Sequence, residues 1–214
     1  MTFYNEINFR DIHGICNSIV PGKIFRSAYL SCFQNNGMLE KIIIDNNITC
    51  IVDLRTESEC SWNPYKSDHI LGCRIINLPI NTKHREANFD AKYNISNNEY
   101  IQYIYCAKNA RETVFNLFTL VDPTKDNMLI HCFSGKDRTG CIIALIELLV
   151  GAKQDIIIKD YLESKQDTLI DKIELYLNFI IKYGSIESYL ISCGISLECI
   201  NKWKYSLTKN YGIK

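Results

Sequence analysis

Four residues with the right chemistry and spacing could together bind and attack a phosphate group. His131 and Cys132 follow an apolar run, five residues intervene, and Arg138 and Thr139 come next. Gly135, within the five, lets the backbone turn and approach an anion closely. The guanidinium of Arg138 offers a planar fork of donors that matches two phosphoryl oxygens. This segment therefore predicts a phosphate-binding loop with a cysteine at its base.

The predicted nucleophile must be a thiolate, and several groups have to stabilise its charge. A free thiol with a pKa of about 8.5 is only a few per cent ionised at neutral pH, and lowering that value by about three requires roughly 4 kcal/mol. A helix N-terminus supplies only about 0.3–2 kcal/mol, so several loop N–H groups, at about 1.5–3 kcal/mol each, must supply the rest. The Thr139 hydroxyl is one further donor. We expect Cys132 to attack phosphorus, and water to hydrolyse the resulting cysteinyl phosphate.

Two other functions also fit a cysteine beside an anion site. One is a non-catalytic module that binds a phosphorylated partner without turnover. The other is a thiol-dependent enzyme of the arsenate-reductase type, which needs a resolving cysteine close by. Cys141, on the apolar stretch that follows the loop, is badly placed for that role. A nucleotide-binding Walker pattern is not met, because Asp137 rather than Ser or Thr follows Lys136.

The motifs resemble those of a known family. His131-Cys132-x5-Arg138-Thr139 resembles the loop of the cysteine-dependent phosphatases, and Gly135-Lys-Asp-Arg-Thr-Gly140 looks like that of the bacterial tyrosine/lipid phosphatases. Further matches are Asn8-Phe-Arg-Asp11, Phe25-Arg-Ser-Ala28 with Leu30, Val52-Asp-Leu-Arg55 with Glu57, Asp160-Tyr-Leu162, and Tyr183-Gly-Ser through Tyr189-Leu190. The resemblance implies an α/β, protein-tyrosine-phosphatase-like fold with a mostly parallel sheet. It also implies catalysis without metal or cofactor on phosphotyrosine proteins, often with phosphoserine/threonine or phosphoinositide turnover.

The resemblance also assigns roles to residues of the loop. It makes Cys132 the nucleophile, Arg138 the phosphate clamp, and Asp137 the proton donor to the leaving oxygen. Lys136 is the position associated with reading additional phosphate charge, as on an inositol ring. Around the phosphate we also expect Phe133, Ser134 and Gly135.

The general acid has competing candidates elsewhere in the chain. Many related phosphatases carry it on a loop just after the third strand, where this sequence has Leu78-Pro-Ile-Asn81, with an amide in place of a carboxylate. That difference favours Asp137. Glu86 or Asp90, on the polar stretch 81–99, are the alternatives, and the basic run Lys83-His84-Arg85 is more simply a solvated surface than a substrate contact.

Three supporting residues are expected around the loop. Arg26 and Arg55 each follow an apolar run, at strand ends where loops meet a site. A structural ion pair with Asp11, Asp53 or Glu57 is favoured over direct substrate contact for both arginines. His131 is expected to organise the loop rather than act as a base, since the preceding strand should bury it.

The elements that would position these residues alternate along the first part of the chain. We predict strands at 23–26, 49–54, 73–78 and 128–131 and helices at 37–46, 97–120 and 139–150, which is typical of a buried, largely parallel sheet. After Gly151 the pattern is helical, with one helix around 169–181 ended by Gly184, and two more capped by Ser185 and Ser196 with Gly194 between them. We expect one domain over 1–214: an α/β core at 1–151 with the phosphate loop at 131–139, and a helical lobe at 152–214.

Composition limits the remaining function classes. Of 214 residues, 24 are Lys or Arg and 24 are Asp or Glu, so the formal net charge of zero argues against nucleic acid as a partner. A helix-turn-helix reading of the last two helices offers only Lys202 and Lys204 as phosphate contacts. The sequence shows no apolar run long enough to span a bilayer and no secretory signal. The ten cysteines include no Cys-x-x-Cys pair, so we expect free thiols in a reducing cytoplasm, with export into a host left open. The oligomeric state is not predicted.

Overall fold

A six-stranded mixed sheet forms the centre of the part of the chain that is described, in a computed structural model covering residues 6–81, 103, 106–108, 110–164 and 168–208. The strand order is β1-β2-β6-β3-β5-β4. The four inner strands run parallel, and the two short edge strands are antiparallel to their neighbours. The strands are β1 (Arg10–Asp11), β2 (Ile24–Ser27), β3 (Cys50–Asp53), β4 (His69–Ile70), β5 (Cys73–Asn77) and β6 (Met128–His131).

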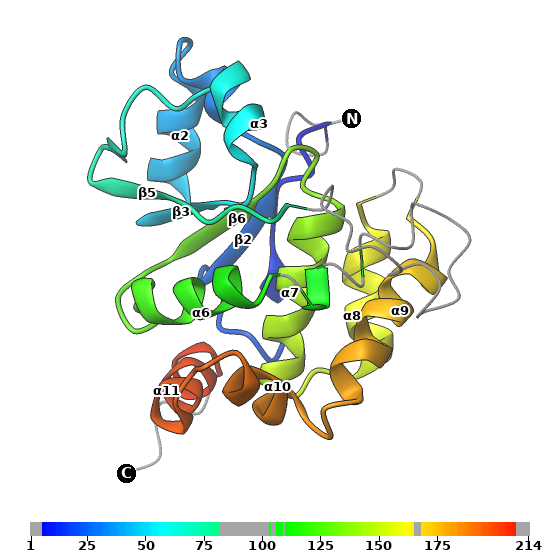
Figure 1. The fold of residues 1–214 in the computed structure, drawn as a ribbon. Coiled ribbons are helices and arrows are strands. Elements are labelled where there is room, and N and C mark those ends of the chain that lie inside the picture. The colour runs from blue at the N-terminus through cyan, green and yellow to red at the C-terminus, as the bar shows by residue number, and fades with distance from the viewer. Residues whose placement is uncertain (1–5, 82–102, 104–105, 109, 165–167, 209–214) are drawn as a thin grey trace.

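Helices cover both faces of the sheet, so the fold has three layers (Figure 1). The first face carries α2 (Met38–Asp45) and α3 (Glu57–Trp62). The second face carries α6 (Arg111–Leu120), α7 (Asp137–Leu149), α8 (Gln154–Leu162), α9 (Ile170–Ile181), α10 (Ile186–Ser192) and α11 (Leu197–Leu207). Two short 3-10 helices, η1 (Ile12–Gly14) and η2 (Ser31–Phe33), lie in the loops next to β1 and β2.

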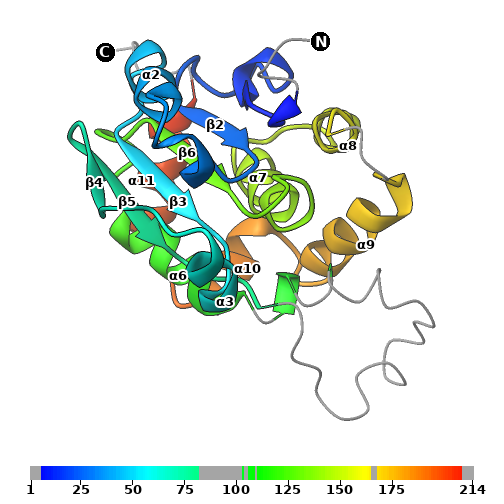
Figure 2. The ribbon, with the colours of Figure 1, turned by 90° about the horizontal axis from the view of Figure 1, so that it is seen from above.

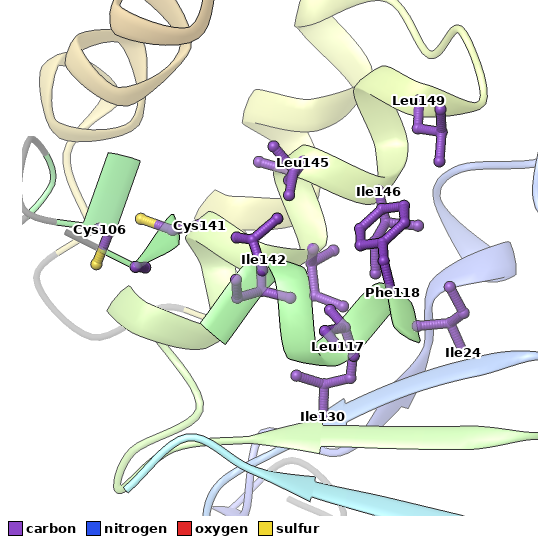
Figure 3. Close-up of a cluster of buried hydrophobic side chains, with 14 of the residues drawn as sticks. Ile24, Cys106, Leu117, Phe118, Ile130, Cys141, Ile142, Leu145, Ile146 and Leu149 are labelled. Carbon is purple, nitrogen blue, oxygen red and sulfur yellow. The ribbon is translucent and has the colours of Figure 1, made fainter. Parts of the chain in front are cut away.

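Successive side chains of a strand point to opposite faces of the sheet, so the hydrophobic core consists of two clusters, one on each face. In β6, Ile130 packs into the larger cluster beneath α7, whereas Leu129 packs on the side of α2. Both faces are covered, which explains why the two central strands, β3 and β6, each begin with three successive apolar residues rather than an alternating pattern. The helix α7 lies deepest, and its Ile142 and Ile146 meet side chains of α6 and of the strands (Figure 3).

The C-terminal helices pack on the second face rather than standing apart. Trp203 of α11 is fully buried and stacks on Phe118 of α6, with ring centroids 4.4 Å apart. Ser185 and Ser196 cap α10 and α11 through their side chains, as predicted. The two lysines that a helix-turn-helix would use are in ion pairs: Lys202 with Asp122 at 2.9 Å and Lys204 with Glu187 at 3.2 Å. Among the described helices, none has both the length and the apolar character to cross a membrane.

Several predicted elements are confirmed with small shifts in their ends. All four predicted strands are present, and the helix expected at 139–150 begins two residues earlier, at Asp137. The helix expected at 97–120 is described as α6 from Arg111; much of its first half lies outside the described residues. The sequence did not reveal α3, α8 or the edge strands β1 and β4. The helix α3 buries none of its own residues, so it leaves no apolar period to detect.

Candidate active site

The carboxyl ends of the four parallel strands lie on the same side of the sheet, and the predicted loop lies there (Figure 2). Ser27, Asp53 and His131 are register partners across β2, β6 and β3, so the segments that follow them begin side by side. Ligands of open α/β sheets bind beyond the carboxyl ends of such strands. The topology therefore gathers the loop after β6, the segment after β2 and the Arg55 segment on this side.

Gly135 is fixed in the loop by its backbone angle and by its neighbours. Its φ is +69°, in the region that favours glycine, and a Cβ there would lie 2.1 Å from the carbonyl oxygen of Ser27. The Gly135 carbonyl accepts hydrogen bonds from Nδ2 of Asn8 at 2.9 Å and from Nη2 of Arg26 at 2.8 Å. The loop therefore packs against the segment after β2 so closely that a side chain at this position would displace it.

The loop closes on the N-terminus of α7, which has no side-chain cap. The first N–H groups of a helix lack partners within the helix, so an uncapped N-terminus can donate them to an anion. Cys132 is buried, with 2 % of its surface exposed. Among the described residues, the Thr139 hydroxyl is buried without a hydrogen-bond partner. A buried hydroxyl without a hydrogen bond lowers the stability of the folded protein, so a partner at this position is expected. This fits the predicted role of Thr139 as a donor to the sulfur or to a bound anion.

Arg138 is held by a bidentate ion pair with Glu59 of α3. Its Nη1 lies 2.6 Å from Oε2 of Glu59 and its Nη2 lies 2.7 Å from Oε1. Burial alone would raise the pKa of Glu59, but the hydrogen bonds from Arg138 and from the Thr56 backbone outweigh it and lower the pKa to about 2. Nη1 also points at the Leu54 carbonyl, 3.4 Å away. Because a guanidinium has five N–H donors, this arrangement leaves the Nε side of the fork for a phosphate.

Arg26 is a structural support of the loop. It is fully buried, forms an ion pair with Asp160 of α8, and donates from Nη2 to the Gly135 and Lys136 carbonyls at 2.8 and 3.2 Å. Arg10 binds the same carboxylate at 2.9 Å. The predicted ion pair for Arg26 is present, but the expected partners were wrong. Asp160 lies far away in sequence and reaches Arg26 only because α8 packs on α7.

Arg55 and His131 form a second buried network on the opposite face of the sheet. Nη2 of Arg55 lies 2.7 Å from Oδ2 of Asp53, which confirms one of the ion pairs expected from the sequence. The Nε2 atom of His131 lies 2.9 Å from the Tyr65 hydroxyl, and its Nδ1 lies 2.9 Å from the Cys132 carbonyl. Burial lowers the pKa of His131. This fits the expectation that His131 braces the loop from behind.

Asp137 opens α7 with its side chain partly exposed, beside the Lys136 ammonium at 3.9 Å. Oδ1 of Asp137 accepts a hydrogen bond from the buried Tyr103 hydroxyl. Asn81, the amide after β5, is exposed. The alternative acids Glu86 and Asp90, and the run Lys83-His84-Arg85, lie outside the described residues.

Comparison with known proteins decides the family. Residues 1–178 match the model of a tyrosine phosphatase family. The chain belongs to this family. A curated relative is the triple specificity protein phosphatase PtpB of Mycobacterium tuberculosis, 27 % identical over an alignment of 188 positions that covers 73 % of this chain and 66 % of that protein. The chain thus spans slightly less than two thirds of that relative.

Solved structures of other phosphatases show weaker similarity to this tyrosine phosphatase family member. TpbA of P. aeruginosa is 14 % identical over 81 % of this chain and 88 % of its own, with a TM-score of 0.42. The core catalytic domain of the PP-IP phosphatase SIW14 of S. cerevisiae, in complex with citrate, is 18 % identical over 83 % of this chain and 92 % of its own, with a TM-score of 0.46.

An aromatic stack borders the predicted phosphate loop. Phe133, the residue after Cys132, lies 4.8 Å from the Tyr29 ring and 6.2 Å from the Trp62 ring, measured between centroids. The Trp62 and Phe133 rings are nearly parallel, and Trp62 is 76 % exposed. A planar, mostly apolar surface is therefore available at the rim of the loop.

Sequence reasoning missed Glu59, Asp160 and Tyr103 as partners of the site. A signal for Glu59 was present, since Thr56 and Glu59 form a capping box at the start of α3. The residue singled out instead, Glu57, is exposed on the same helix. For Asp160 and Tyr103 no local pattern could show the contact, because it depends on how distant segments pack.

Proposed function

We propose that this phosphatase is a metal-independent phosphomonoester hydrolase that acts on phosphotyrosine through a cysteinyl-phosphate intermediate. The observation that carries the proposal is the position of Cys132, at the base of a loop that closes on the uncapped N-terminus of α7. In the first step the Cys132 sulfur attacks phosphorus, the bond to the leaving oxygen breaks, and Asp137 protonates that oxygen. In the second step water attacks phosphorus, the Asp137 carboxylate takes a proton from that water, and the sulfur–phosphorus bond breaks to release the thiolate.

Arg138 serves as the phosphate clamp in this proposal. Glu59 holds its two Nη atoms, so Nε and the free Nη2 hydrogen face in one direction, as bidentate binding of a phosphoryl group requires. The same pair fixes the rotamer before substrate arrives, which lowers the entropy cost of binding. Loop N–H groups around Phe133, Ser134 and Gly135 contribute the remaining donors.

The aromatic stack supports a preference for aryl phosphates. A phosphotyrosine whose phosphate occupies the loop extends its ring toward the rim, where Phe133, Tyr29 and Trp62 offer faces for offset or edge packing. An inositol ring offers hydroxyls instead and gains less from these faces. Lys136 would bind the additional phosphates of such a ring, and phosphoinositides are the second substrate class to test.

The test is phosphate release, with EDTA present, from a phosphotyrosine peptide, a phosphoserine peptide and a phosphoinositide. Cys132→Ser should abolish release while phosphopeptide binding persists. Cys199→Ser is the control, because Cys199 is half-buried near α6 and far from the loop. Binding without release by the unaltered protein would establish a binding module and refute the enzyme. Arsenate-dependent thiol consumption would instead support the reductase alternative.

The proposed acid has its own kinetic signature. Asp137→Asn should slow hydrolysis of phosphate esters with poor leaving groups by about a hundredfold or more, and of activated aryl phosphates far less. Equal loss with both classes would remove Asp137 from the acid role.

Lys136→Met should reduce activity on phosphoinositides and spare activity on phosphotyrosine. If the unaltered protein hydrolyses phosphotyrosine alone, Lys136 does not read inositol phosphates.

A further inference from the structure

The hydroxyl groups of Tyr161, on α8, and Tyr103 form a series of hydrogen bonds that ends at Asp137, on α7. The Tyr103 hydroxyl donates to Oδ1 of Asp137, and the Tyr161 hydroxyl on α8 lies 2.5 Å from the Tyr103 oxygen. Both tyrosines are fully buried, and their rings meet edge to face at 6.1 Å between centroids. Because no solvent reaches these hydroxyls, their hydrogen bonds are fixed by the protein alone.

The protons of this chain can be assigned from the chemistry of phenols. Each phenol has one hydroxyl hydrogen. Tyr103 uses its hydrogen in the hydrogen bond to the Asp137 carboxylate, so Tyr161 must be the donor to the Tyr103 oxygen. Burial and the neighbouring Asp137 raise the pKa of Tyr103, and burial raises that of Tyr161. Both hydroxyls therefore keep their protons at any pH at which the protein works.

Gly140 has no side chain, and this leaves room for the Tyr161 ring beside α7. A Cβ on this helical glycine would lie 2.9 Å from Cδ2 of Tyr161 and 3.6 Å from Nη2 of Arg26. Tyr161 and Asp160 are consecutive residues of α8, and Asp160 holds the Arg26 side chain that supports the loop carbonyls. One turn of α8 thus reaches both the loop and, through Tyr103, the aspartate.

We propose that Tyr103 and Tyr161 are positioning residues for the general acid; this inference rests on the proposed function of Asp137. Tyr103 occupies Oδ1, so Oδ2 carries the proton that is transferred. As the sulfur–phosphorus bond forms, the bond between phosphorus and the leaving oxygen breaks with its electron pair on oxygen, and that oxygen takes the Oδ2 proton. Tyr103 keeps its own proton and stabilises the carboxylate that remains.

The titratable groups around Asp137 determine how pH enters the test. Among the described residues they are Tyr103, Tyr161 on α8, the Lys136 ammonium in the loop, Cys141 one turn along α7, and the loop residues Cys132 and Arg138. Burial raises the pKa of Cys141 well above its ordinary value, as it does for the tyrosines, so these three stay neutral. Lys136, Arg138 and the proposed Cys132 thiolate are the charged members of the set. The Tyr103 hydroxyl donates to Asp137 and to none of these three, so a change in the alkaline limb that is specific to Tyr103→Phe is assigned to Asp137.

The experiment is a pH profile of kcat/KM for Tyr103→Phe with an activated aryl phosphate and with phenyl phosphate. The lost hydrogen bond favoured the carboxylate, so the alkaline limb should move to higher pH by about one unit. Turnover of phenyl phosphate should fall about tenfold or more, with a much smaller loss for the activated ester. Tyr161→Phe should give the same pattern with smaller changes, because it acts through Tyr103.

Tyr189→Phe is the matched control. Tyr189 is also a buried tyrosine, and its hydroxyl donates to the Ala107 carbonyl at 2.6 Å rather than to the acid. Its loss should lower stability without moving the alkaline limb. An unmoved limb in Tyr103→Phe, or the same shift in Tyr189→Phe, would overturn the proposal. Both outcomes are distinct from failure of the proposed function, in which Asp137→Asn itself shows no dependence on the leaving group.

Discussion

The ion pair between Arg138 and Glu59 allows us to predict how much stability the protein loses when the charge of Glu59 is removed. Glu59→Gln keeps a side chain that can complete the capping box with Thr56, so the change isolates the charge that holds Arg138. A pKa lowered from 4.5 to about 2 corresponds to about 3 kcal/mol, at about 1.4 kcal/mol for each tenfold change. Because the Glu59 side chain is 26 % exposed, solvent screening reduces the expected loss of stability to about 2 kcal/mol.

The same pair gives a pH dependence with a definite sign. The pKa of Glu59 is lower in the folded protein than in the unfolded chain, so its stabilisation is complete above the ordinary value of 4.5. It is lost as pH falls from about 4.5 toward 2. Urea unfolding should therefore show a large difference between the unaltered protein and Glu59→Gln at pH 7, less than half of that difference near pH 3, and almost none near pH 2.

The activity assay connects this pair to the clamp. Glu59→Gln should lower kcat/KM for a phosphotyrosine peptide by about tenfold to a hundredfold, because Arg138 must then be ordered by the substrate. Glu57→Gln, on the exposed side of the same helix, is the control and should change neither stability nor activity. A Glu59→Gln variant with unchanged kcat/KM and a pH-independent stability difference would refute the reasoning.

Other predictions concern the loop, the core and the rim. Gly135→Ala should cost about 3 kcal/mol or more in stability and abolish activity, since its Cβ would lie 2.1 Å from the Ser27 carbonyl oxygen; thermal unfolding and phosphate release measure both. Glu147 is 1 % exposed with both oxygens unpartnered among the described residues, and burial raises its pKa well above the ordinary value. The unfolded chain ionises this group above about pH 4.5 and the folded protein does not, so stability falls as pH rises; Glu147→Gln should be more stable than the unaltered protein, by more at pH 8 than at pH 5. Trp62→Ala should raise KM for phosphotyrosine peptides about threefold to tenfold and leave KM for a small alkyl phosphate unchanged; equal effects on both would exclude the rim from substrate binding.

Local sequence carried most of the information on the loop and the inner strands. The apolar runs of β3 and β6 are contiguous, and their burial on both faces follows from helices on each side. The pairing of Arg55 with Asp53 could be foreseen, because the two lie two residues apart. The pairing of Arg26 with Asp160 could not, although both residues stood out as matches to the family.

The chemistry within one short segment could therefore be predicted without knowledge of the fold. From Cys132 to Arg138, chain connectivity alone places nucleophile, turn and cation around one point, and the spacing suffices to predict them. The residues that hold that segment in place became known only from the packing of the folded protein. Glu59 is 79 residues from Arg138, and Asp160 is 134 residues from Arg26. Such pairs depend on how α3 and α8 pack against the sheet and α7, which many distant contacts determine together.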